Sequence, residues 1–420
     1  MALNRENIIN VTAGPSQLPL PVLEEAAKGL LNFRGTGIGI TELSHRSPEF
    51  SALTSDLKNA VRAHLDVPPT HDIMFTQGGG SLQFSAVVLN LLDRHRRLFP
   101  NLEQGERVMD YVLTGSWSVK AFKEAKKLAN GATVNLVHDS RKLSSNGQSF
   151  EEIGPTDGWK FSPNPAFVYY CDNETIDGVQ FGGHLSPNGE GAAQARFPVG
   201  RLPRDPLDPS RPVPLVGDHS SSFGSRPIPN LADHILIYAG AQKNLGPAGL
   251  TILIARKDLL VPASAETPRL FPTTLDYSVL SESNSLYNTP PMFSMYVSLL
   301  VLQHYAREGG LRAVTERNLV KGDKLYASLS EGEKRGVFKL RVKDGSRSWM
   351  NVVFEVPGEG QEERFFKAAA AKGLRGFKGH RCVDIEYLPF KCVDRISQVG
   401  WWCTLIDIQH GHRTTGRCHR

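Results

Sequence analysis

One lysine of this chain has surroundings that change the chemistry of its side chain. Lys243 lies between two short apolar runs, 235–238 and 250–254, which are rich in Ile and Leu as buried strands are. The connection between them is rich in glycine and allows close approach to the backbone. A partly buried ammonium loses hydration, so its pKa falls and it becomes an amine able to form a Schiff base. The alternative is an ordinary loop lysine that reaches solvent.

An aspartate occupies the end of a neighbouring expected strand. Residues 215–218 form a short run that ends at Asp218. A carboxylate beside a pyridine nitrogen keeps that ring protonated, while a lysine forms an imine with the aldehyde of the same cofactor. Asp218 and Lys243 together therefore favour a pyridoxal-type site. A helix-capping or turn role is the alternative for Asp218.

A glycine-rich turn provides a place for a phosphate. An expected strand at 73–76 is followed by Gln-Gly-Gly-Gly-Ser at 77–81, and then by a helical pattern. Backbone N–H groups at such a helix start point at a bound anion. The spacing matches neither a dinucleotide fingerprint nor a Walker A loop, which argues against NAD and ATP and leaves a single phosphate open.

Three further positions carry candidate ligand contacts. His45 and Arg46 end a glycine-rich loop, directly before a helix start at Ser47, and they suit an anionic ligand. Trp117 stands at a strand-to-helix junction, where it stacks on a flat ligand or belongs to the core. Thr175 closes a polar cluster, 172–175, at the carboxyl end of a strand, the edge where open parallel sheets bind ligands. A solvated loop pair is the alternative for His45 and Arg46.

Composition excludes several classes of protein. The 420 residues are 40% hydrophobic and 22% charged, which is typical of a globular protein with two domains or one large α/β domain and an appendage. The net charge of +5 without basic runs argues against nucleic acid, and no apolar stretch is long enough for a membrane span. Cysteines number five, four of them in the last forty or so residues, which favours a reduced, cytoplasmic protein.

Beyond residue 185 the expected order of elements changes. Residues 186–214 contain seven prolines and no periodicity, so we expect a surface insertion too irregular to hold a regular element. A buried helix at 292–305 is expected to begin a second domain. That domain continues with a helix at 314–330, strands near 338–342 and 351–356, and a helix at 362–371.

Together these stretches resemble the phosphoserine aminotransferases, a fold-type I family that uses pyridoxal 5′-phosphate. The resemblance covers roughly residues 8–381, and YAGAQKN with NETIDG is specific beyond the wider group of aminotransferases. It is carried by the motifs AGPSQLP, SHRSPEF, GGGSLQFSAV, DNETIDG, SSSFGSRPI, YAGAQKNLGPAGLT, NTPPMFSMY, SWMNVVF and KGLRGFKGHR.

The resemblance implies an α/β fold of two domains. A large domain, residues 15–288, would hold a mainly parallel seven-stranded sheet flanked by helices, with 186–214 as a surface insertion. Residues 1–14 and 289–381 would form a smaller α+β domain. The family also implies a homodimer with shared active sites.

The resemblance also implies residue roles, with no metal. Lys243 would carry the Schiff base and move the proton, Asp218 would hold the pyridinium, and Trp117 would stack on the ring. The remaining cofactor contacts would be Gly80, Ser81, Thr175 and Gln242, together with Asn288 and Thr289, which would reach the cofactor phosphate of the partner subunit. Substrate phosphate would be bound by His45, Arg46, His380 and Arg381.

The implied reaction transfers an amino group between L-glutamate and 3-phosphohydroxypyruvate, giving 2-oxoglutarate and O-phospho-L-serine, a step of serine biosynthesis. Two rivals are a related enzyme acting on a substrate without phosphate, and a nucleotide binder that uses the glycine turn and has no need of Lys243.

The end of the chain departs from the family pattern. Tyr387 stands where the family has an arginine for the substrate carboxylate, and 382–420 is an atypical C-terminal tail with two tryptophans and scattered Cys and His. We interpret this tail as a mis-spliced or wrongly translated end. It raises the alternative of a homologue that binds the cofactor but is inactive.

Overall fold

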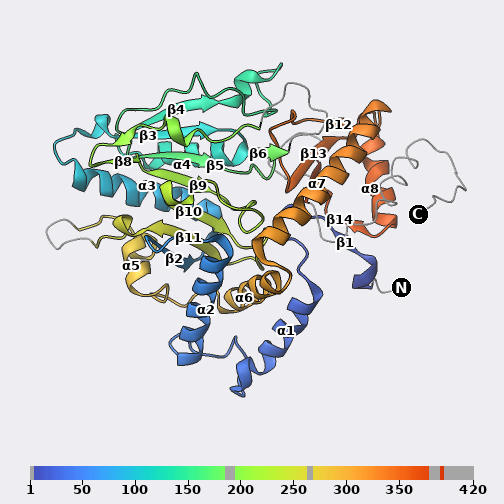
Figure 1. The fold of residues 1–420 in the computed structure, drawn as a ribbon, viewed down its shortest axis with the longest axis horizontal. Coiled ribbons are helices and arrows are strands. Elements are labelled where there is room, and N and C mark those ends of the chain that lie inside the picture. Colours follow the sequence, from blue (N-terminus) through green and yellow to red (C-terminus); the bar gives the residue numbers. More distant parts are fainter. Residues whose placement is uncertain (1–3, 185–193, 263–267, 378–387, 392–420) are drawn as a thin grey trace, which may run out of the picture.

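The computed structural model describes residues 4–184, 194–262, 268–377 and 388–391 (Figure 1). Its largest feature is a seven-stranded sheet in the order β2-β11-β10-β9-β5-β3-β4. Only β11 runs against the direction of the other six strands. The expected mainly parallel, seven-stranded α/β fold is confirmed. The strands are β2 (His71–Thr76), β3 (Val108–Leu113), β4 (Thr133–Asp139), β5 (Phe167–Cys171), β9 (Leu215–Asp218), β10 (His234–Gly240) and β11 (Thr251–Arg256).

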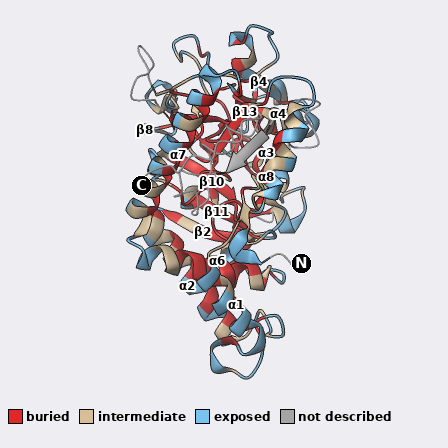
Figure 2. Ribbon diagram, turned by 90° about the vertical axis from the view of Figure 1, so that its right-hand side faces the viewer, coloured by how far each residue is buried: buried red, intermediate tan, exposed pale blue. Residues whose placement is uncertain are grey.

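Helices cover both faces of this sheet, which explains why its central strands read as unbroken apolar runs. One face packs against α1 (Leu20–Leu31), α2 (Pro48–Leu65) and α6 (Met292–Arg307), and the other against α3 (Gly79–Leu98), α4 (Ser116–Leu128) and α5 (Tyr277–Glu282). Successive residues of β10 alternate between the two cores: Ile237 enters the first and Tyr238 the second. Figure 2 shows the buried residues concentrated along this sheet.

The helices that border the site begin where the sequence predicts. Ser47 caps α2, its Oγ accepting a hydrogen bond from the Phe50 N–H at 3.2 Å, and Pro48 occupies the first helical position. At α3, Gly78 serves as the N-cap with φ of 85°, a left-handed conformation that favours glycine. The glycine run therefore allows β2 to turn directly into α3.

A second, smaller group of elements has its own core. The antiparallel sheet β12-β13-β15 (Lys339–Leu340, Asn351–Glu355, Leu388–Lys391) lies with α7 (Gly310–Lys334) and α8 (Gln361–Ala371). The core of this small unit contains Leu325, Phe338 and Phe354. The N-terminal strand β1 (Ile9–Asn10) pairs in parallel with β14 (Leu374–Arg375), which ties the start of the chain to this unit.

Helix α6, which the sequence analysis assigned to the small domain, packs elsewhere. Its residues Met295 and Val301 belong to the same core as Ile237 of the large sheet. We therefore propose a domain boundary at the turn between α6 and α7, with α6 as part of the large domain.

The proline-rich stretch is more regular than expected. In its described part a 3₁₀ turn (Val199–Arg201) leads into the hairpin β7 (Arg204–Asp205) and β8 (Asp208–Pro212), so the expectation that it holds no element is wrong. A two-stranded hairpin has outer edges where a missing N–H costs nothing, and prolines are tolerated there. Leu202 and Val213 flank this hairpin and are buried against Leu215 of the large sheet.

The β6 strand (Val179–His184) continues from the carboxyl end of β5 toward the small unit and forms bridges to Arg347.

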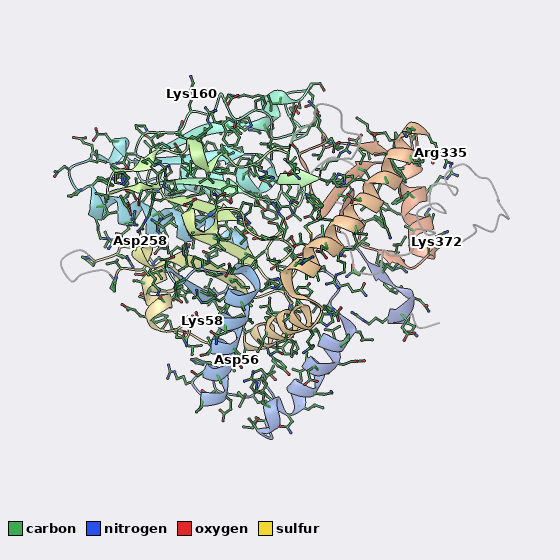
Figure 3. The ribbon with its side chains drawn as sticks, viewed as in Figure 1. Asp56, Lys58, Lys160, Asp258, Arg335 and Lys372 are labelled. Atoms are coloured by element: carbon green, nitrogen blue, oxygen red, sulfur yellow. The ribbon has the colours of Figure 1, made fainter. Side chains whose placement is uncertain are left out.

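Charged side chains such as Lys160 and Arg335, labelled in Figure 3, are exposed at the rim of the molecule. Within the described ranges, the helices are all too short or too polar to cross a bilayer.

The packing of the proline-rich stretch can be tested at Leu202. Leu202→Ala removes a side chain that is 5% exposed, and we expect the free energy of unfolding to fall by about 2–5 kcal/mol because a core cavity is left. Urea denaturation measures the change. The control is Leu207→Ala in the same stretch, since Leu207 is 55% exposed. Equal effects of the two substitutions would contradict the packing described here.

Candidate active site

The carboxyl edge of the large sheet contains a cavity of about 200 Å³. Residues at or just after the ends of five strands, β2, β3, β5, β9 and β10, line it. Seven residues that the sequence analysis selected line this one cavity: Gly80, Ser81, Trp117, Thr175, Asp218, Gln242 and Lys243. A larger cavity of about 460 Å³ surrounds Arg226 and Trp349, but neither Lys243 nor the glycine turn lines it.

Lys243 lies three residues after the end of β10 and is 9% exposed. Its Nζ donates a hydrogen bond to the Ala13 carbonyl oxygen at 3.2 Å. Burial lowers the pKa of Lys243 from 10.5 to about 8, against the opposing attraction of Asp218. A substantial neutral fraction of this amine therefore exists near neutral pH, as a nucleophilic or proton-transferring lysine requires.

Asp218 is the last residue of β9 and is 4% exposed. Its Oδ1 accepts a hydrogen bond from the Ser220 N–H at 2.9 Å. Burial raises the pKa of the Asp218 carboxyl, while hydrogen bonds from Ser220 and Tyr238 and the charge of Lys243 oppose that rise. The carboxylate thus lies in a water-poor cavity with partners that favour its charged form.

The glycine turn leaves backbone open to the cavity. A Cβ on Gly79 would meet nothing within 4 Å, and Gly79 has φ of 59°. A Cβ on Gly80 would lie 3.6 Å from Asp218 Oδ2. The first turn of a helix has N–H groups with no partner inside the helix, and they attract anions. The start of α3 can therefore bind a phosphate next to Asp218 and Lys243.

Trp117 is held in place by a carboxylate pair that the sequence analysis did not assign. Glu174 accepts hydrogen bonds from the N–H groups of Trp117 at 2.8 Å and Ser118 at 2.9 Å, and Asp177 accepts from the Ser116 N–H at 2.6 Å. Both acids thus cap the start of α4. Burial, followed by the nearby charge of Asp177, raises the pKa of Glu174.

The motif NETIDG contained the signal for this clamp, because it supplies both acids and Thr175 from one short loop. Glu174 also packs closely against Gly115, where a Cβ would lie only 2.3 Å from Glu174 Cγ. What the sequence could not show is that the loop after β5 reaches across to the helix after β3.

His45, Arg46, Asn288 and Thr289 lie outside this cavity in the same chain. His45 Nδ1 and Thr289 Oγ1 are 3.1 Å apart, so the structure brings together two residues that were predicted for different ligands. His45 Nε2 is buried without a hydrogen-bond partner. His380, Arg381 and most of the 382–420 tail lie outside the described residues.

The N-terminal segment closes the other side of Lys243. Ser16 Oγ donates to the Lys243 carbonyl oxygen at 2.7 Å, and the Ser16 N–H donates to the Gln242 carbonyl oxygen at 3.3 Å. Lys243 also lines a second, smaller hollow of about 50 Å³ that includes Arg317 and Lys321 of α7. The lysine therefore lies between the sheet-side cavity and the small unit.

The residues present fit a pyridoxal phosphate. The cavity offers a buried amine, a buried carboxylate, a helix N-terminus for a phosphate and an indole for a flat ring. Asn173, which also lines it, has a buried Oδ1 with no hydrogen-bond partner. Over the ranges that the structure describes, no group of three or more His, Cys, Asp or Glu side chains is arranged to hold a metal ion.

This fold with this site defines an aminotransferase, and the aminotransferase class-V family model matches residues 8–182 and 211–409. A phosphoserine aminotransferase of Geobacillus kaustophilus is 42% identical over 374 residues, 89% of this chain and 90% of that one. One of Nitrosomonas europaea is 37% identical over 90% of this chain and 91% of that one. The chain belongs to the phosphoserine aminotransferase family.

Solved structures agree with this assignment. The phosphoserine aminotransferase from Bacillus circulans subsp. alkalophilus has a TM-score of 0.77 at 33% identity, covering 96% of this chain and 97% of that one. The PLP-bound phosphoserine aminotransferase from Trichomonas vaginalis has a TM-score of 0.75 at 31% identity, covering 95% of this chain and 99% of that one. The family-model match skips 183–210, most of the proline-rich stretch, and reaches into the atypical tail.

The buried amine makes stability depend on pH. Well below pH 8 Lys243 is protonated in both the folded and the unfolded state, so the folded protein bears the full cost of a buried charge. That cost diminishes as pH rises from about 8 toward 10.5, because the folded protein then releases the proton while the unfolded chain still holds it. Lys243→Met removes the cost. We expect its stability advantage over the cofactor-free wild type to shrink by roughly 2 kcal/mol between pH 7.5 and pH 10.

Urea denaturation of both cofactor-free proteins at the two pH values measures this difference. Lys160→Met, which removes an exposed amine, controls for the substitution itself. A difference between wild type and Lys243→Met that does not change with pH would contradict a buried amine of low pKa.

Proposed function

We propose that this chain transfers the amino group of L-glutamate to 3-phosphohydroxypyruvate, giving O-phospho-L-serine and 2-oxoglutarate in serine biosynthesis. Its cofactor is pyridoxal 5′-phosphate. The observation that carries the proposal is that Lys243 and Asp218 meet in one buried cavity, in a chain 42% identical to a phosphoserine aminotransferase. Relatives of this kind give no support to the alternative of an inactive homologue.

When bound, pyridoxal phosphate supplies an aldehyde that condenses with amines and a ring that withdraws electrons from the carbon bearing the amino group. In the proposed arrangement the N–H groups of Gly80 and Ser81 would bind its phosphate. The Asp218 carboxylate would accept a hydrogen bond from the ring nitrogen, and the Trp117 indole would stack on the ring. Thr175 and Gln242 complete the polar rim.

Lys243 has two tasks in this proposal. Its Nζ would hold the cofactor between turnovers. Once free, the same amine would remove a proton from the substrate carbon and return that proton at a later stage of the transfer. A pKa of about 8 suits both tasks, because the amine exchanges a proton readily near neutral pH. The hydrogen bond to the Ala13 carbonyl keeps the side chain directed along the cavity wall.

Glu174 and Asp177, which cap the start of α4, support the Trp117 indole indirectly. Because Glu174 and Asp177 cap the first turn, the backbone around Trp117 is fixed at three successive N–H groups, those of residues 116–118. An aromatic ring that is already in place costs less conformational entropy on ligand binding than a free one. The clamp is therefore a positioning device for the stacking residue.

The substrate phosphate is assigned to His45, Arg46, His380 and Arg381, and the chain is proposed to act as a homodimer. In one chain His45 and Thr289 lie together but outside the Lys243 cavity, which supports the proposal that they serve the site of a different copy. A dianion suits paired guanidinium and imidazole groups. We propose a cytoplasmic location, which the free thiol of Cys171 supports.

The absorbance of the purified protein tests the first half of the reaction. We expect a visible band from the cofactor joined to Lys243, and a shift of that band when L-glutamate is added. Lys243→Ala is expected to lose the joined-cofactor band. A band that does not respond to glutamate would favour the inactive-homologue alternative. Replacing 3-phosphohydroxypyruvate by hydroxypyruvate in the second half tests whether the phosphate is required.

Hybrid dimers test the shared site. Lys243→Ala and Arg46→Ala are each expected to be inactive alone. After the two variants are mixed and allowed to exchange subunits, one site of each hybrid has both residues, and we expect about a quarter of wild-type activity if half the dimers are hybrids. Thr289→Ala mixed with Lys243→Ala should recover activity in the same way.

No recovery despite exchange, measured with differently tagged subunits, would place Arg46 in the same chain's site as Lys243. A mixture of Lys243→Ala and Asp218→Ala serves as the control, because both residues lie in one cavity and hybrids of this pair contain no intact site.

A further inference from the structure

Two buried tyrosines lie behind Asp218 on neighbouring strands. Tyr238 of β10 is paired in register with Asp218 of β9, and Cys171 of β5 is paired with Asp218 on the other side. Paired residues of adjacent strands project from the same face of a sheet, and so does Tyr169, two positions before Cys171. Both tyrosines are fully buried in the core under α3 and α4.

The hydroxyl groups of these tyrosines pair with each other on the face of the sheet from which Asp218 also projects. Tyr169 OH and Tyr238 OH are 2.9 Å apart. The Tyr238 ring edge and Asp218 Oδ2 both lie close to Gly80, 3.7 and 3.6 Å from a Cβ built on that residue. A hydrogen bond from Tyr238 lowers the pKa of Asp218, in opposition to the burial that raises it.

Proton counting favours one direction for the hydrogen bond between the two tyrosines. Each tyrosine hydroxyl has one proton to donate, while a carboxylate can only accept. The arrangement that satisfies every group is one in which Tyr169 donates to Tyr238, and Tyr238 donates to Asp218. A hydrogen bond to a charged acceptor is worth more than one between neutral groups, which favours the same direction.

We propose that Tyr238, oriented by Tyr169, is a positioning residue that keeps the Asp218 carboxylate charged and thereby keeps the proton on the cofactor's ring nitrogen. This inference rests on the proposed function, since it requires the bound cofactor. Without the Tyr238 proton, the carboxylate becomes more basic, and the shared proton moves from the ring nitrogen toward Asp218. The ring then withdraws electrons less effectively.

Other titratable groups around Asp218 also affect whether the shared proton stays on the ring nitrogen or moves to Asp218. Lys243 faces it across the cavity and stabilises its charge, whereas Glu174 and Cys171 are close enough to the tyrosines and the lysine to influence them. Cys171 is also paired with Asp218 in the sheet, but Cys171 lines the cavity and Tyr238 does not. The backing hydroxyl can therefore be removed without altering the cavity lining.

The test is the ¹⁵N chemical shift of cofactor labelled at its ring nitrogen and bound to the holoenzyme. In Tyr238→Phe we expect a shift toward the value of neutral pyridine, with kcat lowered about tenfold. Tyr169→Phe should shift the resonance in the same direction by less. The control Tyr111→Phe changes a buried tyrosine of the same core, stacked on Tyr169 with ring centroids 5.0 Å apart but one strand further from Asp218, and should leave the shift unchanged.

A Tyr238→Phe enzyme that binds cofactor with an unchanged ring-nitrogen shift would overturn the inference, whatever its stability or activity. If Tyr238→Phe does not fold, the Tyr169→Phe shift decides between the two outcomes. Wild-type protein that binds no labelled cofactor would instead overturn the proposed function, so the two failures are distinguishable.

Discussion

An amine and a carboxylate that are both removed from water impose the main constraint on this molecule. Burial destabilises the charged form of each, and only their mutual attraction and a few hydrogen bonds oppose that cost. Such a pair needs a rigid frame, because a small displacement would let water in or separate the charges. The sheet supplies it: Asp218 ends one strand and Lys243 follows the next, so backbone pairing sets their separation.

Much of this frame was visible in the sequence because it depends on local patterns. Apolar runs ending at polar residues predicted the strands, and glycines before a helical pattern predicted the turn at the start of α3. Each selected cavity residue lies near a strand end, which is why a one-dimensional pattern could find it. The choice between stacking and core roles for Trp117 could not be made this way, because both use the same residue type at the same position.

Features that depend on contacts between distant segments were missed or misjudged. The hairpin near Leu202 has no hydrophobic alternation, and its regularity comes from packing against the large sheet. The Glu174 clamp requires that the loop after β5 meet the helix after β3, which is a property of strand order. The pairing of His45 with Thr289 joins residues far apart in sequence, so no local pattern predicts it.

The connection between the small unit and the lysine has a mechanical consequence. Within a few residues, the N-terminal segment passes from a strand of the small unit, through Ala13 and Ser16, to contacts with both the side chain and the backbone of Lys243. No other element intervenes along this path. Any change in the position of the small unit would therefore act on the Lys243 nitrogen through only the short segment 11–16.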